Sequence, residues 1–343
     1  MSEQPPVITN AASTGIRIDR AQLKQLAERS DRAGLVYLGQ WFALLALTAA
    51  GIWYTMGTVW VWLAMFAHGV LLSVPAYALS HETAHGSVFK TRWLNKLVLW
   101  VTSLIYMEEP WHRRYTHLNH HAHTWHVDLD SQMPFDTPMT FRGWLLEASG
   151  LALLLFHVRV MIALCFKRYS PIMLAVIPEQ KLPMVTRNAR LMLAFYLSIA
   201  LAAGFGITWP LWYFVIPRLL GAPVMMLFTL IQHVEMAENS PSIIDSTRSF
   251  RTNWLGRFLY VNMNYHIEHH LYPQVPFYAL PQLNATIREQ LPEPDPGFFR
   301  TNLEVLGVVI RRSLGRNTRA RTIRQAAHHV TDGGYQPIAR ATM

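Results

Sequence analysis

Long uninterrupted apolar stretches occur in two pairs along this chain. The first pair covers residues 34–56 and 58–79, and the second covers residues 191–207 and 211–231. A helix crosses the hydrocarbon core of a bilayer with about 20 apolar residues, so each stretch has a suitable length. The links within each pair are short and uncharged. The pattern predicts an all-α integral membrane protein with four transmembrane helices arranged in two hairpins.

Two further apolar segments fit a span less well. Residues 94–107 are too short to cross a bilayer, which favours an interfacial or buried helix. Residues 144–166 are long enough, but Glu147, His157 and Arg159 interrupt them. We therefore expect a helix at the membrane interface there rather than a fifth span.

Composition and charge agree with a membrane protein. The chain is 51% hydrophobic and only 15% charged, whereas a soluble domain has about 25% charged residues. Of the 30 lysines and arginines, only Arg218 lies within the four predicted spans and their two links. The positive-inside rule then places both chain ends and the loop between the second and third spans in the cytoplasm. We expect Arg218 either to have a function inside the fourth span or to extend its side chain to the interface.

The net charge of +9 suits contact with anionic lipid headgroups, and because the chain contains no nucleic-acid-binding motif, we expect no nucleic-acid partner. The single cysteine, Cys165, excludes a disulfide framework and an iron–sulfur centre built from this chain alone.

The ends of the chain are polar. We expect residues 1–15 to be disordered, and residues 16–32 to form a weakly amphipathic helix that is solvated or lies on the membrane. Prolines break residues 271–291, which should pack without spanning. The tail from Arg311 is rich in arginine and should be solvated or lie on the lipid surface. We divide the chain into an N-terminal cytoplasmic segment, a membrane domain and a basic C-terminal cytoplasmic tail, at residues 1–33, 34–292 and 293–343.

Histidines are concentrated in three clusters. The first directly follows the second predicted span, the second lies in the loop between the second and third spans, and the third lies after the fourth span. Six of the 16 histidines fall within residues 112–126. Imidazoles at this density repel one another when protonated, and a bound metal relieves that cost. The spacings are H-x3-H, H-x2-HH and H-x2-HH, and on a helix positions i, i+3 and i+4 share one face. The candidate ligands of a polynuclear metal site are His81, His85, His117, His120, His121, His266, His269, His270 and, directly after the fourth span, His233.

The ligand type leaves the metal open, because imidazole suits iron, zinc, copper and nickel. His81-Glu82-Thr83-Ala84-His85 also matches the H-E-x-x-H motif of zinc peptidases, in which the glutamate is the general base. A membrane zinc peptidase would leave the two H-x2-HH clusters unexplained. A bis-histidine haem protein would need histidines facing each other inside the spans, where only His68 clearly lies.

The three clusters taken together resemble the membrane fatty acid desaturase and hydroxylase superfamily. The third reads Asn264-Tyr265-His266-Ile267-Glu268-His269-His270-Leu271-Tyr272-Pro273 and runs into a proline-rich segment, as in desaturases. Gln232-His233 resembles the Gln-His that follows the last span and supplies a further iron ligand. The resemblance covers residues 34–292. It implies a non-haem di-iron centre that uses O2 and two electrons to oxidise an unactivated C–H bond of an acyl chain.

The resemblance leaves the outcome of the oxidation open. It favours a fatty acid desaturase, with a hydroxylase or monooxygenase acting on a hydrocarbon or small polar substrate as the alternative. His266 stands where front-end desaturases have glutamine, and the chain has no His-Pro-Gly-Gly motif of a fused cytochrome b5, which argues against front-end desaturation. The boxes are also similar to those of bacterial rhizopine-catabolism oxygenases. Thr229 stands where animal acyl-CoA desaturases have an asparagine that holds a water on one iron.

The resemblance also implies outer residues and partners. Carboxylates should orient the metal-binding imidazoles by accepting their remaining N–H. Electrons must come from a separate ferredoxin, rubredoxin or cytochrome b5-like protein, and Arg113 and Arg114 are candidates for a basic face that binds it. The candidate carboxylates are Glu82, Glu268, Glu235 and Asp130, and the histidines expected beside the site without binding metal are His112, His123 and His126.

Overall fold

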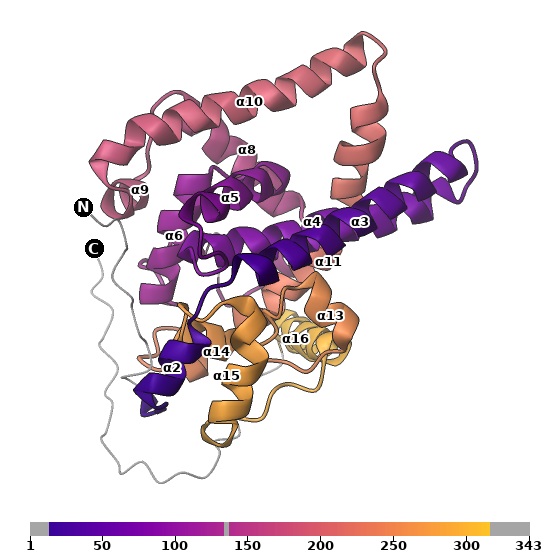
Figure 1. Cartoon of the computed structure of the whole chain (residues 1–343). Coiled ribbons are helices and arrows are strands. Elements are labelled where there is room, and N and C mark those ends of the chain that lie inside the picture. Colours follow the sequence, from indigo (N-terminus) through magenta and orange to yellow (C-terminus); the bar gives the residue numbers. More distant parts are fainter. Residues whose placement is uncertain (1–13, 134–136, 316–343) are drawn as a thin grey trace.

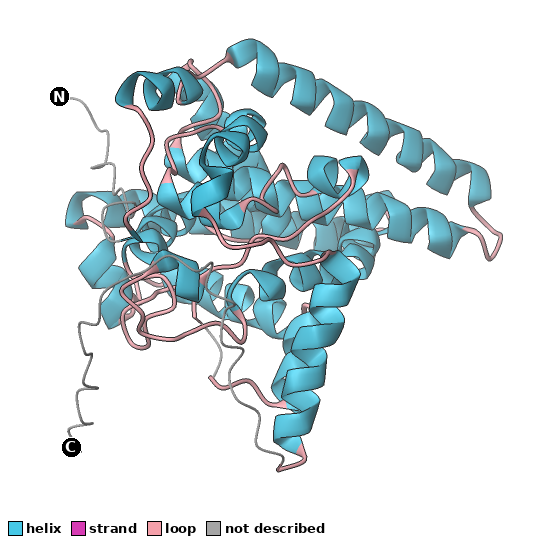
Figure 2. Cartoon of the chain, turned by 90° about the horizontal axis from the view of Figure 1, so that it is seen from below, coloured by secondary structure: helices cyan, strands magenta, loops and turns pink. Residues whose placement is uncertain are grey.

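The computed structural model describes residues 14–133 and 137–315, and these ranges are built from helices (Figures 1 and 2). Within them, the pairing of Phe250 with Asp295 is an isolated bridge and no longer strand forms. The longer helices are α3 (Asp31–Thr55), α4 (Val61–His85), α5 (Arg92–Tyr106), α6 (Pro110–Ala122), α8 (Leu151–Cys165), α10 (Leu182–Gly204), α11 (Ile216–His233) and α16 (Phe298–Ser313). The shorter ones are α2 (Arg20–Leu26), α7 (Phe141–Ala148), α9 (Pro171–Val176), α12 (Ile243–Ser246), α13 (Trp254–Leu259), α14 (His266–Leu271) and α15 (Leu280–Ile287).

Helices α3 and α4 form the first predicted hairpin. The hydroxyl of Ser30 accepts a hydrogen bond from the backbone N–H of Ala33 and so starts α3. The indole of Trp41 donates to the carbonyl of Leu71 at 2.7 Å and ties the two helices together. Helix α4 continues to His85 and ends at Gly86, which has the left-handed conformation (φ 69°) that glycine adopts readily. One continuous helix thus carries the first histidine cluster from the apolar stretch into the site.

Helix α11 packs directly on α4. A Cβ at Gly69 would lie 1.8 Å from the backbone oxygen of Pro217, and a Cβ at Gly221 would lie 2.0 Å from the oxygen of Gly69. The two backbones are therefore in contact where glycines face each other. Arg218 is half-buried beside this crossing and donates to the carbonyl of Tyr106 at 2.8 Å and to that of Ile105. It thereby satisfies carbonyls at the end of α5 that lack a helical partner.

The count of spans differs from the prediction in its details. Among the described residues, three helices are long and apolar enough to cross a membrane: α3, α4 and Leu211–His233, which begins with a π-helical turn (Leu211–Val215) and continues as α11. A fourth is reached if α7 and α8, bent by 69°, form one broken span. The predicted third span is not among them. Helix α10 carries Arg187 and Arg190, so its apolar part starts only at Leu191, and the helix ends at Gly204 rather than at residue 207.

Residues 144–166 do not form the single interfacial helix that we predicted. Gly150, with φ 75°, separates α7 from α8. Residues 16–32 likewise contain the short helix α2, a break, and the start of α3 at Asp31. The predicted helix over residues 94–107 is present as α5, and residues 271–291 pack as expected, with Leu280, Leu283 and Ile287 fully buried.

Helices α2 and α13–α16 gather below α3, α4 and α11 in Figure 1 and form a helical cap beside the apolar helices. The cytoplasmic location of this cap stays a prediction. Gln290 accepts a hydrogen bond from the backbone N–H of Arg17 at 2.8 Å, so the N-terminal segment contacts the residues that follow α15. The described part of the C-terminal segment also packs on the core, through Val305 and Val309 of α16. The domain limits at residues 33 and 292 stay a prediction. The predicted disorder of residues 1–13 and the tail from residue 316 lie outside the described residues.

Candidate metal centre

Helix α6 holds the central histidine cluster, and its start is fixed by local sequence. Pro110 occupies the first turn, where its missing N–H costs nothing. The carboxylate of Glu109 caps the helix by accepting a hydrogen bond from the backbone N–H of His112 at 2.6 Å. The helix then runs to Ala122. The predicted helical placement of His117, His120 and His121 is confirmed.

The histidines converge from four segments into two groups of four. In each group, one nitrogen from every member lies within 4.8 Å of the others, and all eight side chains are buried. The first group is His81, His117, His121 and His269, and the second is His120, His233, His266 and His270.

Each H-x2-HH cluster contributes to both groups. On α6, His117 and His121 belong to the first group, while His120 belongs to the second. On α14 the division is reversed, because His269 belongs to the first group and the pair at i and i+4, His266 and His270, belongs to the second. On the shared face, the residue at i+4 is rotated from residue i by about 40° in one direction and the residue at i+3 by about 60° in the other. Helix geometry therefore allows the i and i+4 imidazoles to join one group and the i+3 imidazole to join the other.

The ring nitrogens are spaced as ligands of one ion would be. The Nε2 atom of His121 lies 3.1 Å from that of His117 and 3.2 Å from that of His269. In the second group, Nε2 of His266 lies 3.1 Å from both His233 and His270. Nitrogens about 2.1 Å from a common ion would be roughly 3.0–3.4 Å apart.

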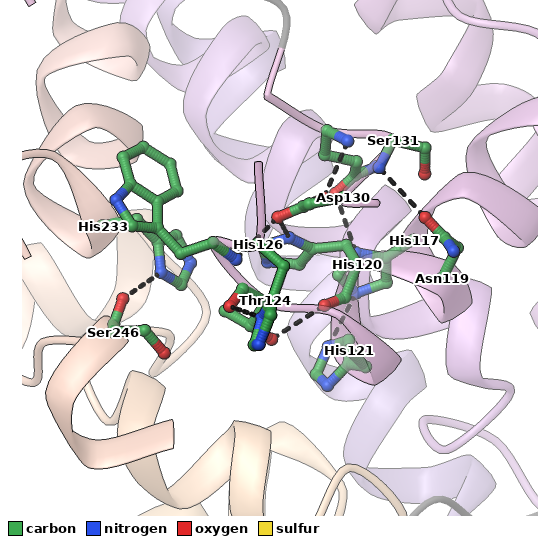
Figure 3. Close-up of polar contacts among 12 residues, drawn as sticks. His117, Asn119, His120, His121, Thr124, His126, Asp130, Ser131, His233 and Ser246 are labelled. Carbon is green, nitrogen blue, oxygen red and sulfur yellow. Dashed lines mark hydrogen bonds and ion pairs between the residues drawn. The ribbon is translucent and has the colours of Figure 1, made fainter. Parts of the chain in front are cut away.

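Polar groups behind the rings orient these nitrogens. Nδ1 of His120 donates to Asp130 at 2.8 Å, and Nδ1 of His233 donates to the carbonyl of Ser246 at 2.8 Å (Figure 3). The Nδ1 of His117 lies 3.1 Å from Oε1 of Gln132. With the proton on Nδ1, each Nε2 turns a lone pair toward the centre of its group. Converging lone pairs require a cation, so the residues fit a pair of metal ions.

Glu82 lies behind the first group. Its Oε1 is 3.1 Å from Nδ1 of His269 and 3.4 Å from Nδ1 of His81. The carboxylate therefore faces the backs of two imidazoles that come from different segments. A general base of the H-E-x-x-H type would instead face the substrate side of the metal. The zinc peptidase alternative has no support in this arrangement.

The electrostatic surroundings favour neutral imidazoles. Burial lowers the pKa of His117, His121 and His270 well below the usual value, and neighbouring histidines lower it further. Burial alone would raise the pKa of Asp130, but the charge of His120 and its hydrogen bond lower the pKa overall. Neutral rings beside an ionised carboxylate are the protonation states that metal binding needs.

Other predicted residues lie at or beyond the edge of the two groups. Nε2 of His85 is 2.8 Å from Nε2 of His117, but His85 is half-buried and outside both groups of four. Glu268 is buried and accepts hydrogen bonds from Ser249, at 2.6 Å, and from Asn284 rather than from an imidazole. Which of these histidines bind metal stays a prediction.

Two outer predictions are wrong. Glu235 does not orient an imidazole, because its carboxylate pairs with Arg312. Arg113 does not belong to a basic surface, because it is 3% exposed and lies 3.7 Å from Glu108. Of the three flanking histidines, only His112 contacts a carboxylate, since its Nδ1 donates to Glu108 at 2.9 Å.

The haem alternative also fails on geometry. Both ring nitrogens of His68 are in contact with protein, Nδ1 with the hydroxyl of Thr48 at 2.7 Å and Nε2 with the carbonyl of Tyr213 at 3.1 Å. The ring therefore links α3, α4 and the π-helical turn before α11. No nitrogen is left for an axial position.

A cavity of about 100 Å³ lies against both groups. His117 of the first group and His120 and His233 of the second line it, so one bound molecule could reach both. Its other walls mix apolar side chains with a buried polar set: Glu108, His112, Arg113, His157 and Gln232. The sequence predicted His112 beside the site, but it did not predict a role there for Glu108 or His157. The signals in the sequence were weak: Glu108 precedes a helix start, and His157 interrupts an apolar stretch.

The comparisons with known proteins agree with this site. The chain matches the fatty acid desaturase family over residues 58–302. It is 27% identical over 242 residues to a sphingolipid delta(4)-desaturase/C4-monooxygenase of Mus musculus, an alignment that covers 67% of each protein. It is 29% identical over 112 residues to an sn-1 oleoyl-lipid 12-desaturase of Anabaena variabilis, covering 32% of this chain and 28% of that protein. A Synechocystis protein of the same name is 32% identical over 81 residues, covering 23% of this chain and 21% of its own length.

The family match covers most of the chain, so this protein belongs to the fatty acid desaturase family. It is an integral membrane oxidoreductase of the desaturase type. The resemblance seen in the three histidine clusters is confirmed.

Proposed function

We propose that this protein introduces a double bond into an acyl chain of a membrane lipid, with two iron ions held by the two histidine groups. The observation that carries the proposal is the pair of four-nitrogen groups beside one cavity. When bound, a pair of irons would activate O2 to remove hydrogen from an unactivated C–H bond. The sphingolipid and oleoyl-lipid desaturases among the relatives support a lipid substrate.

The chain itself positions the ligands and the substrate. Asp130, Gln132 and the carbonyl of Ser246 accept the Nδ1 protons of three rings and so hold them with Nε2 inward. The carboxylate of Glu82 lies behind a fourth ring, with its Oε1 3.1 Å from Nδ1 of His269. The cavity beside the groups is small, so it holds the carbons to be oxidised rather than a whole acyl chain. Because the cavity would hold those carbons close to both histidine groups, the oxidation would take place within one bound complex, and the fixed orientation of the substrate would contribute much of the rate enhancement.

We further propose four spans in two hairpins, with α10 completing the second, in the inner membrane if the host is a bacterium. Exposed aromatic side chains occur at both hairpin tips: Trp53 and Tyr54 are 77% and 89% exposed, and Trp209 is 65% exposed. Such residues prefer the membrane–water interface. The tips point away from the cap that carries α14 (Figure 1). The positive-inside rule places the basic loop and chain ends in the cytoplasm, so the histidine groups would face the cytoplasm.

This topology can be tested by labelling from one side of the membrane. In a Cys165→Ser background, Thr58→Cys at the first tip should react with a membrane-impermeant maleimide added outside intact cells. The matched control, Lys24→Cys on α2, should react only after lysis. Labelling of Lys24→Cys in intact cells would contradict the orientation.

We propose that the electron donor is an acidic protein, such as a ferredoxin, rubredoxin or cytochrome b5-like carrier. A second cavity of about 630 Å³ opens beside His85, and no acidic side chain is among the residues that line it. Five basic side chains line this cavity: Arg29, Arg92, Lys96, Arg114 and Lys181. Such a face would steer an acidic carrier toward the first histidine group.

Charge reversal tests the carrier site. Arg92→Glu with Lys96→Glu should slow reduction by the carrier and weaken the dependence of the rate on salt, because both side chains are exposed. Arg142→Glu, an exposed charge on α7, serves as the control. An unchanged rate and salt dependence in the double variant would refute this part of the proposal.

The central proposal is tested by metal and product analysis. Protein purified in detergent without chelators should contain two irons per chain, and His120→Ala and His269→Ala should each reduce that content. His123→Ala, outside both groups, should not. Lipids from expressing cells should gain double bonds by mass spectrometry, whereas a hydroxylase would add an oxygen atom. One zinc per chain, kept in both ligand variants, would overturn the proposal.

A further inference from the structure

The cavity beside the histidine groups has a polar wall that the oxidation of a plain hydrocarbon does not need. Glu108, His112, Arg113, His157 and Gln232 all line it, and each is buried. An acyl segment in contact with this wall would remove these groups from water and give them nothing in exchange. The polar wall therefore indicates that the substrate carries a polar group near its reacting carbons.

Arg113 is the central residue of this wall. Its guanidinium lies 3.7 Å from Glu108 and packs over the rings of Tyr77 and Tyr106, with centroids at 5.1 and 5.5 Å. Its Nε and Nη2 atoms have no hydrogen bond of acceptable geometry to any described residue. Nε2 of Gln232 is likewise without an acceptor among the described residues. Two side chains that line the same cavity thus carry buried N–H donors without an acceptor.

The charges of the wall select the kind of acceptor that would pair with these donors. Burial would raise the pKa of Glu108, but the hydrogen bond from His112 and the charge of Arg113 lower it to about 2, so the carboxylate is ionised. One negative and one positive charge then lie side by side. An incoming carboxylate would meet Glu108 as well as Arg113, whereas a neutral oxygen would meet only the donors.

We infer that the cavity binds a neutral oxygen of the substrate, a hydroxyl or an amide or ester carbonyl, through Arg113 and Gln232, a few carbon atoms from the carbon that is oxidised. The distance follows from helix geometry. Arg113 and His117 are four residues apart on α6, so their side chains share a face with Cβ atoms about 5–6 Å apart. The inference rests on the proposed function for the oxidation step, but the recognition of oxygen is separable from it.

The test measures binding without turnover. Purified protein with its native metal would be titrated under argon, without an electron donor, with four ligands of equal chain length in the same detergent. These are octadecanol, octadecanamide, stearate and octadecane. A hydrogen bond from a charged donor predicts that the alcohol and the amide bind roughly tenfold to a hundredfold more tightly than octadecane. Stearate should gain less than either of them.

Variants assign the preference to this wall. Glu108→Gln/Arg113→Met removes both charges together and keeps an acceptor for His112, so it avoids leaving one buried charge alone. In this variant the alcohol and the amide should bind no more tightly than octadecane, while metal content and thermal unfolding show that the protein is folded. Gln232→Leu should reduce the preference by a smaller factor and serves as a second variant if the double variant does not fold.

The outcomes separate the inference from the proposed function. Equal affinity for octadecanol and octadecane in the unmodified protein would overturn the inference, even if the protein desaturates lipids. A preference for the neutral oxygen that is kept when Arg113 is replaced would also overturn it. A preference that depends on Arg113, in a protein that oxidises none of the ligands once electrons are supplied, would uphold the recognition of oxygen and refute the proposed function.

Discussion

Glu82→Gln is the substitution that tests the architecture of the site most directly. Glu82 is fully buried on α4, and its Oε1 lies 3.1 Å from Nδ1 of His269 and 3.4 Å from Nδ1 of His81. The glutamine has the same shape but lacks the negative charge. Two rings of the first histidine group would therefore lose a charged acceptor, while no ligand is removed.

The expected magnitude follows from these two contacts. Neither contact has hydrogen-bond geometry in this structure, so the magnitude applies once metal binding turns both Nδ1–H groups toward Glu82. A hydrogen bond to a charged group contributes about 1.5–3 kcal/mol and one to a neutral group about 0.5–1.5 kcal/mol, so each contact would then lose about 1 kcal/mol. Together they amount to about 2 kcal/mol, or roughly 30-fold in metal affinity. This lies within the 10- to 100-fold range typical when a residue behind a metal ligand is replaced.

The assay is a titration of metal-free protein with Fe(II) under argon in competition with a chelator of known affinity. We expect the ion of the first group to bind roughly 30-fold more weakly and the ion of the second group to be weakened less, since Glu82 contacts only the first group. Glu268→Gln is the matched control. It is also a buried carboxylate among the histidines, but it binds Ser249 and Asn284. Unchanged affinity in Glu82→Gln, or an equal loss in Glu268→Gln, would refute the assignment of Glu82 as the residue that orients the first group.

Three further predictions concern packing, pH and stoichiometry. Gly69→Ala places a Cβ 1.8 Å from a backbone oxygen of α11, so we expect little folded protein by size-exclusion chromatography in detergent. The control is Gly39→Ala, which should match the unmodified protein because no atom lies within 4 Å of its added Cβ. The metal-free protein should lose stability as the pH falls below about 6.5, because imidazoles such as that of His117 take up protons only on unfolding; each contributes up to about 1.4 kcal/mol per pH unit. A thermal unfolding temperature independent of pH would contradict this. Metal analysis should show a smaller loss in His85→Ala than in His81→Ala, because only His81 belongs to a group of four.

The sequence indicated the helices that have a simple apolar pattern and the histidines that define the site. Helix α4 was predictable through His85 because its apolar stretch runs to Leu79 and the H-x3-H spacing continues the helix to Gly86, although Pro75 lies inside it. The third span was harder. Arg187 and Arg190 lie within α10, and a pattern that starts at Leu191 does not show that the helix starts earlier, at Leu182. A single left-handed glycine, Gly150, divides what appeared to be one apolar stretch.

The pairing of histidines across segments could not be predicted. Spacing places His117 and His121 on one face, but which histidine of α14 meets them depends on how two helices are rotated about their axes. The polar wall of the cavity is a similar case. Glu108 and His157 are far apart in the chain, and their approach to within 3.9 Å results from packing of α8 against the start of α6. Neither contact leaves a periodic signal in the sequence.

The division of each H-x2-HH cluster between both groups has a consequence for how the protein acquires its metals. If His117 and His121 hold the first ion, the turn of α6 that also presents His120 would be ordered by that binding. The same holds on α14, where His269 and His270 are neighbours. Binding at one group would therefore lower the conformational-entropy cost of binding at the other, so metal loading should be positively cooperative. At limiting iron the population should then consist mainly of empty and fully loaded molecules, with few half-loaded ones.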